Sequence, residues 1–314
     1  MNAQPRCLVL GGKGFIGSHL VDALLERGYP VRVFDRVNLT PLNSQVSTSA
    51  IEWFDGDFTS EADVSQALAG CGVCFHLVST TLPKSSNADP VFDVETNLMS
   101  TVRLLNHAVR VGVRKVIFIS SGGTVYGTPR YLPIDESHPT DPICSYGITK
   151  LSIEKYLGLF HQLHGLDYTV LRLSNPFGER QRTQASQGAV AVFLGKVLRG
   201  EKIEIWGDGS VVRDYVYIAD VVAAMLVAMD YCGAERVLNI GSGCGISLNE
   251  VLDGIERVTG RKADRFYTAG RAFDVPASVL AIDRAQHTLG WAPRTPFIEG
   301  LQRMARWMEG QNRA

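Results

Sequence analysis

A run of glycines near the start of the chain constrains the fold more than any other feature. Gly11-Gly12-Lys13-Gly14-Phe15-Ile16-Gly17 follows the apolar stretch Cys7–Leu10 and opens a segment with helical spacing, residues 15–27. Glycine permits a tight turn and lets the backbone approach a bound group closely. A helix that begins at such a turn offers N–H groups and the positive end of its dipole to a phosphate. The sequence therefore predicts a strand–turn–helix unit that binds the pyrophosphate of a dinucleotide.

The acid that ends the second apolar stretch, Val31–Asp35, indicates which dinucleotide is bound. The carboxylate of Asp35 can accept hydrogen bonds from both ribose hydroxyls of NAD and would repel the 2′-phosphate of NADP. Lys13 and Arg36 favour the opposite choice, because either cation could meet that phosphate. The glycine turn and Asp35 together favour NAD as the cofactor.

Short apolar stretches and helical segments alternate through the first half of the chain. Strands are expected at residues 7–10, 31–35, 51–54, 73–78, 115–120 and 168–173, and helices at 15–27, 61–69, 91–111 and 146–164. Such alternation predicts an α/β fold, a doubly wound parallel sheet with helices on both faces. After Asn175 the elements become shorter and more often interrupted. We expect a sheet domain of residues 1–174 and about 218–244, and a smaller C-terminal α/β substrate lobe of 175–217 and about 245–314.

A tyrosine and a lysine lie four residues apart in the last of these helices. Tyr146 and Lys150 therefore share one helix face, so a phenol and an ammonium act on the same space. A nearby ammonium favours the phenolate and makes Tyr146 a candidate general base. A Tyr-x-x-x-Lys spacing is common by chance, but here it follows a dinucleotide turn and a serine-rich strand end.

Composition excludes several classes of function. The net charge of −1 gives no electrostatic reason to expect nucleic acid or an anionic membrane as a partner. No stretch is apolar enough to span a bilayer, and the first residues do not resemble a signal peptide. Cys71 and Cys74 have no second pair or fitting histidines, so free thiols and a cytoplasmic location are expected. No histidine spacing suggests a metal.

Further motifs extend over most of the chain. They are Ser120-Ser-Gly-Gly-Thr-Val-Tyr-Gly127, Arg172-Leu-Ser-Asn-Pro-Phe-Gly178, Gly207-Asp-Gly-Ser-Val-Val-Arg-Asp-Tyr-Val216 and Arg271-Ala-Phe-Asp-Val-Pro276. With the glycine turn and Tyr146/Lys150, the chain resembles the extended short-chain dehydrogenase/reductases, which have a Rossmann fold. The resemblance is to their NAD-dependent nucleotide-sugar epimerase/dehydratase family, specifically the UDP-hexose 4-epimerase branch, and runs from the first strand to about Leu289.

This resemblance implies roles for individual residues. On the cofactor side these are Gly11, Gly14, Phe15, Ile16 and Gly17 at the pyrophosphate, Asp35 at the adenosine ribose, Asp57 and Phe58 at the adenine, Leu77, Ser79 and Asn97 along the cofactor, and Tyr146 and Lys150 at the nicotinamide end. On the substrate side they are Lys84, Asn175, Ile205, Trp206, Arg213, Arg271, Asp274 and Ser278. Two separated arginines suit a diphosphate, because their planar forks bind its oxygens in pairs.

One position departs from the family. The hydroxyl residue that usually accompanies the tyrosine and lysine aligns with Gly122. Thr124 or Ser121 could replace it, or Tyr146 could act alone, and the sequence leaves these three readings open.

The resemblance implies a reaction and leaves three rivals to it. The favoured reaction is reversible oxidation at carbon 4 of a UDP-hexose, with rotation of the 4-keto sugar and return of the hydride to its other face. A 4,6-dehydratase is disfavoured because Gly123 and Thr124 replace its Asp-Glu pair. A 4-keto reductase and a non-catalytic NAD-sensing scaffold would also fit the same fold, since fold does not dictate function.

The resemblance also implies a substrate gate and an assembly. The residue two after Pro276 limits sugar size in the family, and the small Ser278 predicts that UDP-N-acetylglucosamine and UDP-N-acetylgalactosamine are accepted, with or without UDP-glucose and UDP-galactose. Relatives pair their two long helices into a four-helix bundle, which predicts a homodimer.

Overall fold

The computed structural model describes residues 4–42, 50–183, 188–270 and 275–311. Residue contacts divide the chain into two compact units. The first consists of Met1–Thr128, Pro139–Arg172 and Val222–Leu238, and the second of Pro129–His138, Leu173–Val221 and Asn239–Ala314. The expected division differs from this one mainly at 129–138. That segment belongs to the second unit because Ile134 forms a β-bridge with Leu280 and its N–H donates to the Val279 carbonyl at 2.8 Å.

The first unit is built on a seven-stranded sheet, and the predicted α/β fold class is confirmed. The strand order is β10-β6-β5-β4-β1-β2-β3. The strands are β1 (Cys7–Leu10), β2 (Val31–Asp35), β3 (Ile51–Asp55), β4 (Val73–His76), β5 (Lys115–Ser121), β6 (Asp167–Leu173) and β10 (Val237–Ile240). The chain starts at β1 in the interior and winds outward in both directions, and the β1–β2 and β1–β4 pairs are parallel.

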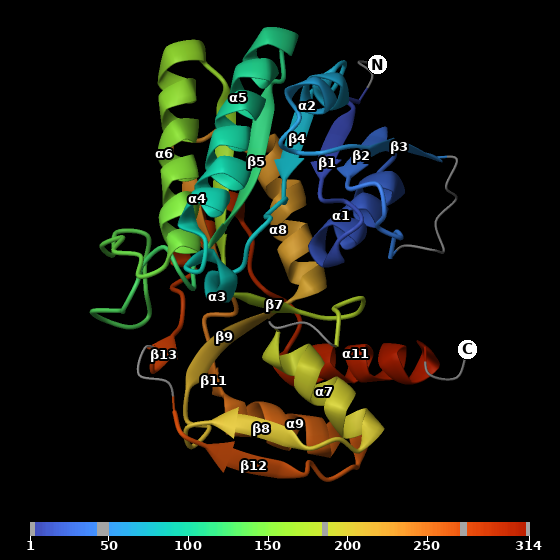
Figure 1. Cartoon of the computed structure of the whole chain (residues 1–314), viewed down its shortest axis with the longest axis vertical. Coiled ribbons are helices and arrows are strands. Elements are labelled where there is room, and N and C mark those ends of the chain that lie inside the picture. The colour runs from blue at the N-terminus through green and yellow to red at the C-terminus, as the bar shows by residue number, and fades with distance from the viewer. Residues whose placement is uncertain (1–3, 43–49, 184–187, 271–274, 312–314) are drawn as a thin grey trace. The chain divides into compact units, whose positions relative to one another are not determined.

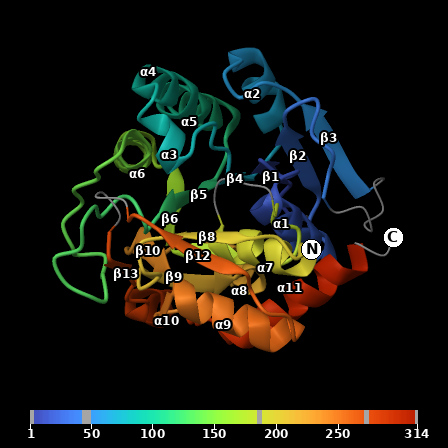
Figure 2. The same ribbon diagram turned by 60° about the horizontal axis from the view of Figure 1, so that its bottom comes forward.

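Helices cover both faces of this sheet (Figures 1 and 2). The helices of this unit are α1 (Phe15–Glu26), α2 (Glu61–Leu68), α3 (Pro83–Ser86), α4 (Pro90–Asp93), α5 (Ser100–Val111), α6 (Ser145–His164) and α8 (Ile218–Asp230). One continuous core cluster includes Leu8 and Leu10 of β1, Leu104 of α5 and Leu157 of α6. The four residues of β1 are entirely buried, as expected for a strand covered on both faces.

The helix expected at 91–111 is not a regular α-helix. It starts as α4, passes through a six-residue π-helical segment, η2 (Val94–Met99), and continues as α5. Polar side chains bond the backbone through this stretch: Asn97 Nδ2 donates to the Asp93 carbonyl at 3.1 Å and Thr101 Oγ1 to the Asn97 carbonyl at 2.6 Å. Such π-bulges occur frequently at functional sites.

The second unit combines two small sheets with packed helices. One sheet has the order β11-β9-β13, with β7 also paired to β9, and the other joins β12 to β8. The elements are β7 (Asn175–Phe177), α7 (Ala189–Arg199), β8 (Ile203–Trp206), β9 (Val212–Tyr217), β11 (Gly245–Ser247), α9 (Leu248–Thr259), β12 (Arg265–Thr268), β13 (Ala277–Ser278), α10 (Asp283–Leu289) and α11 (Phe297–Gln311). Helices α7 and α11 both pack on α9. Within the described ranges, no helix has the length and apolarity needed to cross a membrane.

Candidate active site

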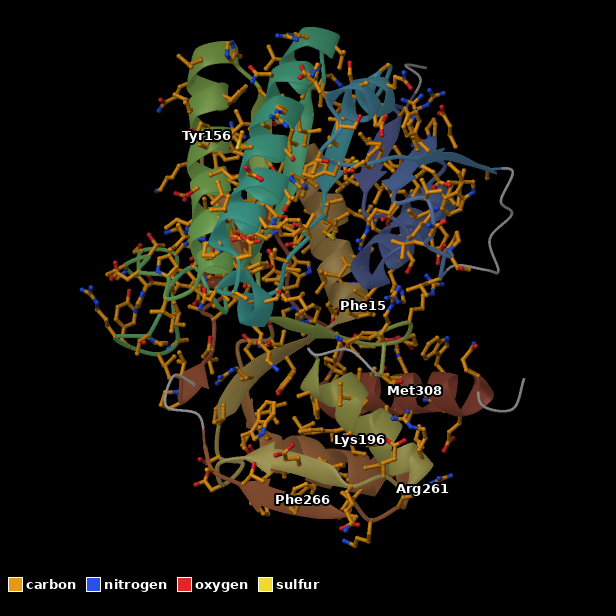
Figure 3. All side chains as sticks on the ribbon, viewed as in Figure 1. Phe15, Tyr156, Lys196, Arg261, Phe266 and Met308 are labelled. Carbon is orange, nitrogen blue, oxygen red and sulfur yellow. The ribbon has the colours of Figure 1, made fainter. Side chains whose placement is uncertain are left out.

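The glycine turn between β1 and α1 forms a cradle that only glycine allows. Gly11 has a φ of 86°, and a Cβ on Gly17 would lie 2.2 Å from the Gly11 carbonyl oxygen. Helix α1 begins at Phe15, marked in Figure 3, and its N-cap is Gly14, which provides no side-chain cap. The first N–H groups of α1 therefore stay available to an anion rather than to a capping side chain.

Asp35 lies beside this turn at the end of β2. Its Oδ2 accepts the Lys13 N–H and its Oδ1 accepts the Arg36 N–H, both at 2.9 Å. A carboxylate has about four acceptor sites, so each oxygen keeps one for a ribose hydroxyl. The structure thus holds Asp35 in place at the turn without using up its capacity to bind a diol.

The side chain of Lys13 is bound to an acid that sequence reasoning missed. Lys13 Nζ lies 2.5 Å from Asp55 Oδ1 and 5.9 Å from the centre of the Trp53 ring. Parallel pairing of β2 with β3 places Asp55 in register with Asp35. The cation that could have favoured NADP is therefore paired with a carboxylate. The sequence holds only a weak indication of this ion pair, because Asp55 is simply one more acid at the end of a strand.

The remaining cofactor-side residues differ in what they offer. Leu77 lies against Gly11, whose Cβ would be 3.6 Å from the Leu77 Cβ. The Phe58 ring is buried and lies 5.1 Å from the His76 ring, so Phe58 can offer a ligand only its backbone. Asp57 Oδ1 accepts the Thr59 N–H and hydroxyl, while Ser79 is exposed and donates to the Thr81 carbonyl.

Asn97 is buried among protein groups. Its Oδ1 accepts the Thr80 N–H at 2.9 Å, and its Nδ2 donates to the hydroxyls of Thr80 and Thr81 and to Asp93 Oδ1. This amide therefore orders the segment that carries Ser79. That arrangement agrees with an indirect role in cofactor binding.

Tyr146 and Lys150 occupy the first two turns of α6. Side chains from the segment before α4 cap this helix: Asn87 Oδ1 accepts the Ser145 N–H at 2.9 Å and Ser86 Oγ accepts the Tyr146 N–H at 3.0 Å. Lys150 Nζ donates to the Ile119 carbonyl at 2.9 Å and lies 5.6 Å from the centre of the Tyr146 ring. The structure thus brings together the predicted pair at the carboxyl end of β5.

Burial dominates the protonation of this pair. It lowers the pKa of Lys150 to about 8, against the opposing effects of Asp93 and Glu154. It also raises the pKa of Tyr146 well above its ordinary value, and the charges of Cys144 and Asp93 act in the same direction. In the protein alone, burial therefore outweighs the effect expected from Lys150 on the Tyr146 pKa. A further positive charge beside the ring would favour the phenolate.

The turn around Gly122 brings a different hydroxyl to the start of α6. A Cβ on Gly147 would lie 2.8 Å from the Thr124 carbonyl oxygen, so Thr124 packs directly against the residue after Tyr146. The Thr124 Oγ1 is buried, and the described residues provide it with no hydrogen-bond partner. Ser121 is partly buried and its carbonyl accepts the Thr124 N–H. The unsatisfied hydroxyl makes Thr124 a candidate to bind a ligand atom, which would require its side chain to turn because the oxygen is closed to solvent here.

Of the expected substrate residues that the structure describes, all but Lys84 lie in the second unit. Asn175 Nδ2 donates to the Asp214 carbonyl at 2.9 Å, and Arg213 Nη1 donates to the carbonyls of Val212 and Val275 at 2.8 Å. The pairing of β13 with β9 places Ser278 in register with Arg213. Arg271 and Asp274 lie outside the described residues.

The two residues expected at uracil lie on opposite faces of β8. Ile205 is buried, and the Trp206 side chain is 41% exposed. Because side chains alternate along a strand, only Trp206 can present its side chain to a ligand there. Lys84 is exposed on α3 in the first unit.

Comparisons with known proteins agree with this geometry. The model of the NAD-dependent epimerase/dehydratase family matches residues 7–241. The chain belongs to that family. A UDP-glucose 4-epimerase of Mycolicibacterium smegmatis is 36% identical over 312 residues, covering 98% of this chain and 99% of the relative.

Two solved structures of the family are similar over nearly the whole chain. The Thermotoga maritima UDP-glucose 4-epimerase, solved with UDP-glucose, is 37% identical with a TM-score of 0.90, covering 98% of this chain and 99% of that one. The UDP-N-acetylglucosamine 4-epimerase of Methanobrevibacter ruminantium, solved with UDP-N-acetylmuramic acid, is 29% identical with a TM-score of 0.92 and the same coverage.

NAD is the cofactor of this epimerase/dehydratase chain, and the residues present fit it. The glycine cradle and the uncapped start of α1 suit its pyrophosphate, and the free acceptor sites of Asp35 suit its ribose hydroxyls. The oxidised nicotinamide ring is itself a cation. When bound, it would add a positive charge that favours the Tyr146 phenolate.

Proposed function

We propose that this protein catalyses the NAD-dependent 4-epimerisation of a UDP-hexose. The observation that carries the proposal is a tyrosine–lysine pair at the start of α6, with Lys150 buried and Tyr146 partly buried, in the same unit as the glycine cradle and Asp35. A phenol beside an ammonium suits removal of a proton from a sugar hydroxyl. The names of the relatives support the choice of UDP-hexoses as substrates.

Residues of the first unit would carry out the chemistry at carbon 4 of the hexose, each in a different role. NAD, when bound, accepts a hydride and returns it. Tyr146 takes the proton of the 4-hydroxyl. After the 4-keto sugar has turned its other face toward the cofactor, Tyr146 returns the proton to the 4-oxygen. Lys150 holds the ribose at the nicotinamide end and keeps a positive charge near the phenolate. The unsatisfied Thr124 hydroxyl would bond the 4-oxygen in place of the residue missing at Gly122, and Ser121 is the second candidate.

The second unit would hold the nucleotide part of the substrate. Arg213 and Arg271 would bind the diphosphate, with Asn175 beside them, because two guanidinium groups match its oxygens. Asp274 would accept from the uridine ribose and Trp206 would pack on the uracil, with Ile205 contributing backbone only. Lys84 would contribute a further cation toward the phosphates. Holding the sugar by its diphosphate leaves the hexose free to rotate.

The N-acetylated pair of sugars is part of the proposal. Ser278 is small, buried and in register with Arg213, so it would lie near the diphosphate and the first sugar ring. A small residue leaves room for a group at carbon 2, whereas a clash in a packed pocket is costly. The similarity to a UDP-N-acetylglucosamine 4-epimerase agrees with this wider specificity.

A homodimer and a cytoplasmic location complete the proposal. Exposed apolar side chains lie on α4 and α6, which a second copy would cover. All six cysteines are free thiols, which agrees with a reducing compartment.

The test is a proton NMR assay with NAD and each of four sugars: UDP-glucose, UDP-galactose and their N-acetylated counterparts. Interconversion within either pair supports the proposal. Loss of water from the sugar would instead identify a 4,6-dehydratase. Reduction of a supplied 4-keto sugar without interconversion would identify a reductase. If the protein binds NAD but turns over none of the sugars, it would be a non-catalytic NAD-sensing scaffold.

A further inference from the structure

A buried carboxylate that the sequence did not single out lies behind the tyrosine–lysine pair. Asp93, the last residue of α4, is fully buried. Its Oδ2 accepts the hydroxyls of Ser145 at 2.7 Å and Thr149 at 2.8 Å. Its Oδ1 accepts Asn97 Nδ2 at 3.0 Å and the Thr81 hydroxyl. These four donors match the acceptor sites of one carboxylate, which compensates for its burial.

The two bonds to Oδ2 fix the rotation of α6. Ser145 and Thr149 are four residues apart, so they lie one above the other on one face of the helix. Two bonds from the same oxygen to points one turn apart resist both sliding and turning of the helix. Tyr146 and Lys150 each follow one of these residues, which places them about 100° further around the axis. By fixing the rotation of α6, Asp93 therefore also fixes the directions in which the Tyr146 and Lys150 side chains point.

The two bonds to Oδ1 connect the same carboxylate to the cofactor side. Thr81 and Asn97 belong to the network that orders the Thr80 N–H and the adjoining Ser79. One side chain thus joins the segment expected along the cofactor to the helix that carries the reacting groups. All of these residues lie in the first unit.

We propose that Asp93 is a positioning residue, which sets the rotation of α6 so that Tyr146 and Lys150 meet the cofactor and the sugar hydroxyl in a reactive arrangement. This inference rests on the proposed epimerase function. A misplacement of about 1 Å can cost about a hundredfold in rate, so a small rotation of α6 has a large effect. A role limited to stability would instead lower the melting temperature and leave the turnover of the folded enzyme intact.

The first arm of the test removes and then restores the hydrogen bond from the Thr149 hydroxyl to Asp93. Thr149→Val deletes the hydroxyl but keeps the shape of the side chain, and Thr149→Ser keeps the hydroxyl. We expect Thr149→Val to lower kcat about tenfold or more while KM and the affinity for NAD stay within about threefold, and Thr149→Ser to keep kcat within about threefold. The matched control is Thr169→Val, because the described residues give the buried Thr169 hydroxyl no partner. It should keep wild-type kcat.

The second arm removes the charge of Asp93 and measures the pKa of Lys150, which does not require turnover of a substrate. Asp93 and Glu154 raise the pKa of Lys150 against its burial, and His76 and Tyr146 are the other titratable groups facing it. In Asp93→Asn the pKa of Lys150 should fall below its wild-type value of about 8, and the pH profile of kcat should move with it. NMR of carbon-labelled lysine reads this pKa directly, with the signal assigned through Lys150→Met.

Two results would overturn the proposal: wild-type kcat in Thr149→Val, or equal losses in Thr149→Val and Thr149→Ser. An unchanged Lys150 pKa in folded Asp93→Asn would also contradict it. If the wild-type protein turns over no UDP-sugar, the proposed function fails. The Lys150 titration then still decides whether Asp93 acts on the pair.

Discussion

At the scale of single residues, the proposed reaction would depend on two hydroxyl groups, those of Tyr146 and Thr124. Tyr146→Phe removes the proton acceptor without changing the packing, so turnover should fall roughly a hundredfold or more. Thr124→Val should lower turnover clearly if its unsatisfied hydroxyl binds the sugar oxygen, and Thr124→Ser should restore it. Initial rates from the NMR assay measure both effects. Full activity of Thr124→Val would exclude that role and direct the same test to Ser121→Ala.

In the proposed function, the size of Ser278 would set the range of substrates. Ser278→Tyr should abolish turnover of the N-acetylated pair and spare UDP-glucose and UDP-galactose, because the ring would fill the space for the carbon-2 substituent. Ser278→Ala is the matched control and should keep both pairs. The comparison is of kcat/KM for each pair in the two variants. If the tyrosine variant still accepts the N-acetylated pair, Ser278 does not act as the gate.

We expect the preference for NAD over NADP to depend on an ion pair as well as on Asp35. Asp55 binds the Lys13 ammonium at 2.5 Å, while the Lys13 N–H bonds Asp35, so the cation lies close to the ribose site. In Asp55→Asn the ammonium would lose its charged partner and become available to a 2′-phosphate. The affinity for NADP relative to NAD should rise roughly tenfold, the scale of one charge-assisted hydrogen bond.

Calorimetry with both cofactors measures this ratio without any sugar. Glu52→Gln is the control, because Glu52 lies on the same strand but pairs with Arg6 and Arg32. It should leave the ratio unchanged. If the affinity for NADP relative to NAD is unchanged in Asp55→Asn, Asp35 alone determines the choice of cofactor.

At the scale of the elements, β4 ends in a histidine whose protonation affects stability. His76 Nε2 lies 2.8 Å from Thr101 Oγ1, and that hydroxyl already donates to the Asn97 carbonyl. Nε2 must therefore carry the hydrogen, which leaves the buried Nδ1 as an acceptor. Burial, with a contribution from Lys150, lowers the pKa of His76 to about 3.

This shift predicts acid sensitivity with a definite sign. Between about pH 6.5 and 3 the unfolded chain binds a proton at this histidine and the folded chain does not, so the free energy of unfolding falls as the pH falls. His76→Gln keeps a donor toward Thr101 but removes the titration. Its melting temperature should therefore drop less than that of the wild type between about pH 7 and pH 5. His164→Gln, at the exposed end of α6, is the control and should follow the wild type.

The same elements show what the sequence could and could not predict. The strand–turn–helix unit at Gly11–Gly17, the acid at Asp35 and the pair on α6 were predictable, because periodicity and local spacing determine them. Asp93 and the Lys13–Asp55 pair were not, because each depends on residues 42 to 56 positions apart that only the fold brings together. Asp93 did leave one signal: it precedes Asn97 by four residues, so both lie on one helix face.

At the scale of the whole molecule, the exposed apolar residues predict a homodimer. Ile148, Tyr156, Leu159 and Leu163 are exposed on one face of α6, and Val91 and Phe92 are exposed on α4 (Tyr156 is labelled in Figure 3). Helices α5 and α6 pack side by side, so a second copy could cover both in an isologous interface. Clustered exposed apolar side chains on neighbouring helices are typical of an interaction surface.

Light scattering at micromolar concentration tests this assembly. The wild type should have about twice the chain mass of 34.3 kDa. Leu159→Asp places a charge in the middle of the α6 face and should give a monomer, because an unpaired charge is costly to bury at an interface. Val227→Asp makes the same change at an exposed position of α8, away from this face, and should stay dimeric. A wild-type monomer, or equal dissociation of both variants, would contradict the four-helix interface.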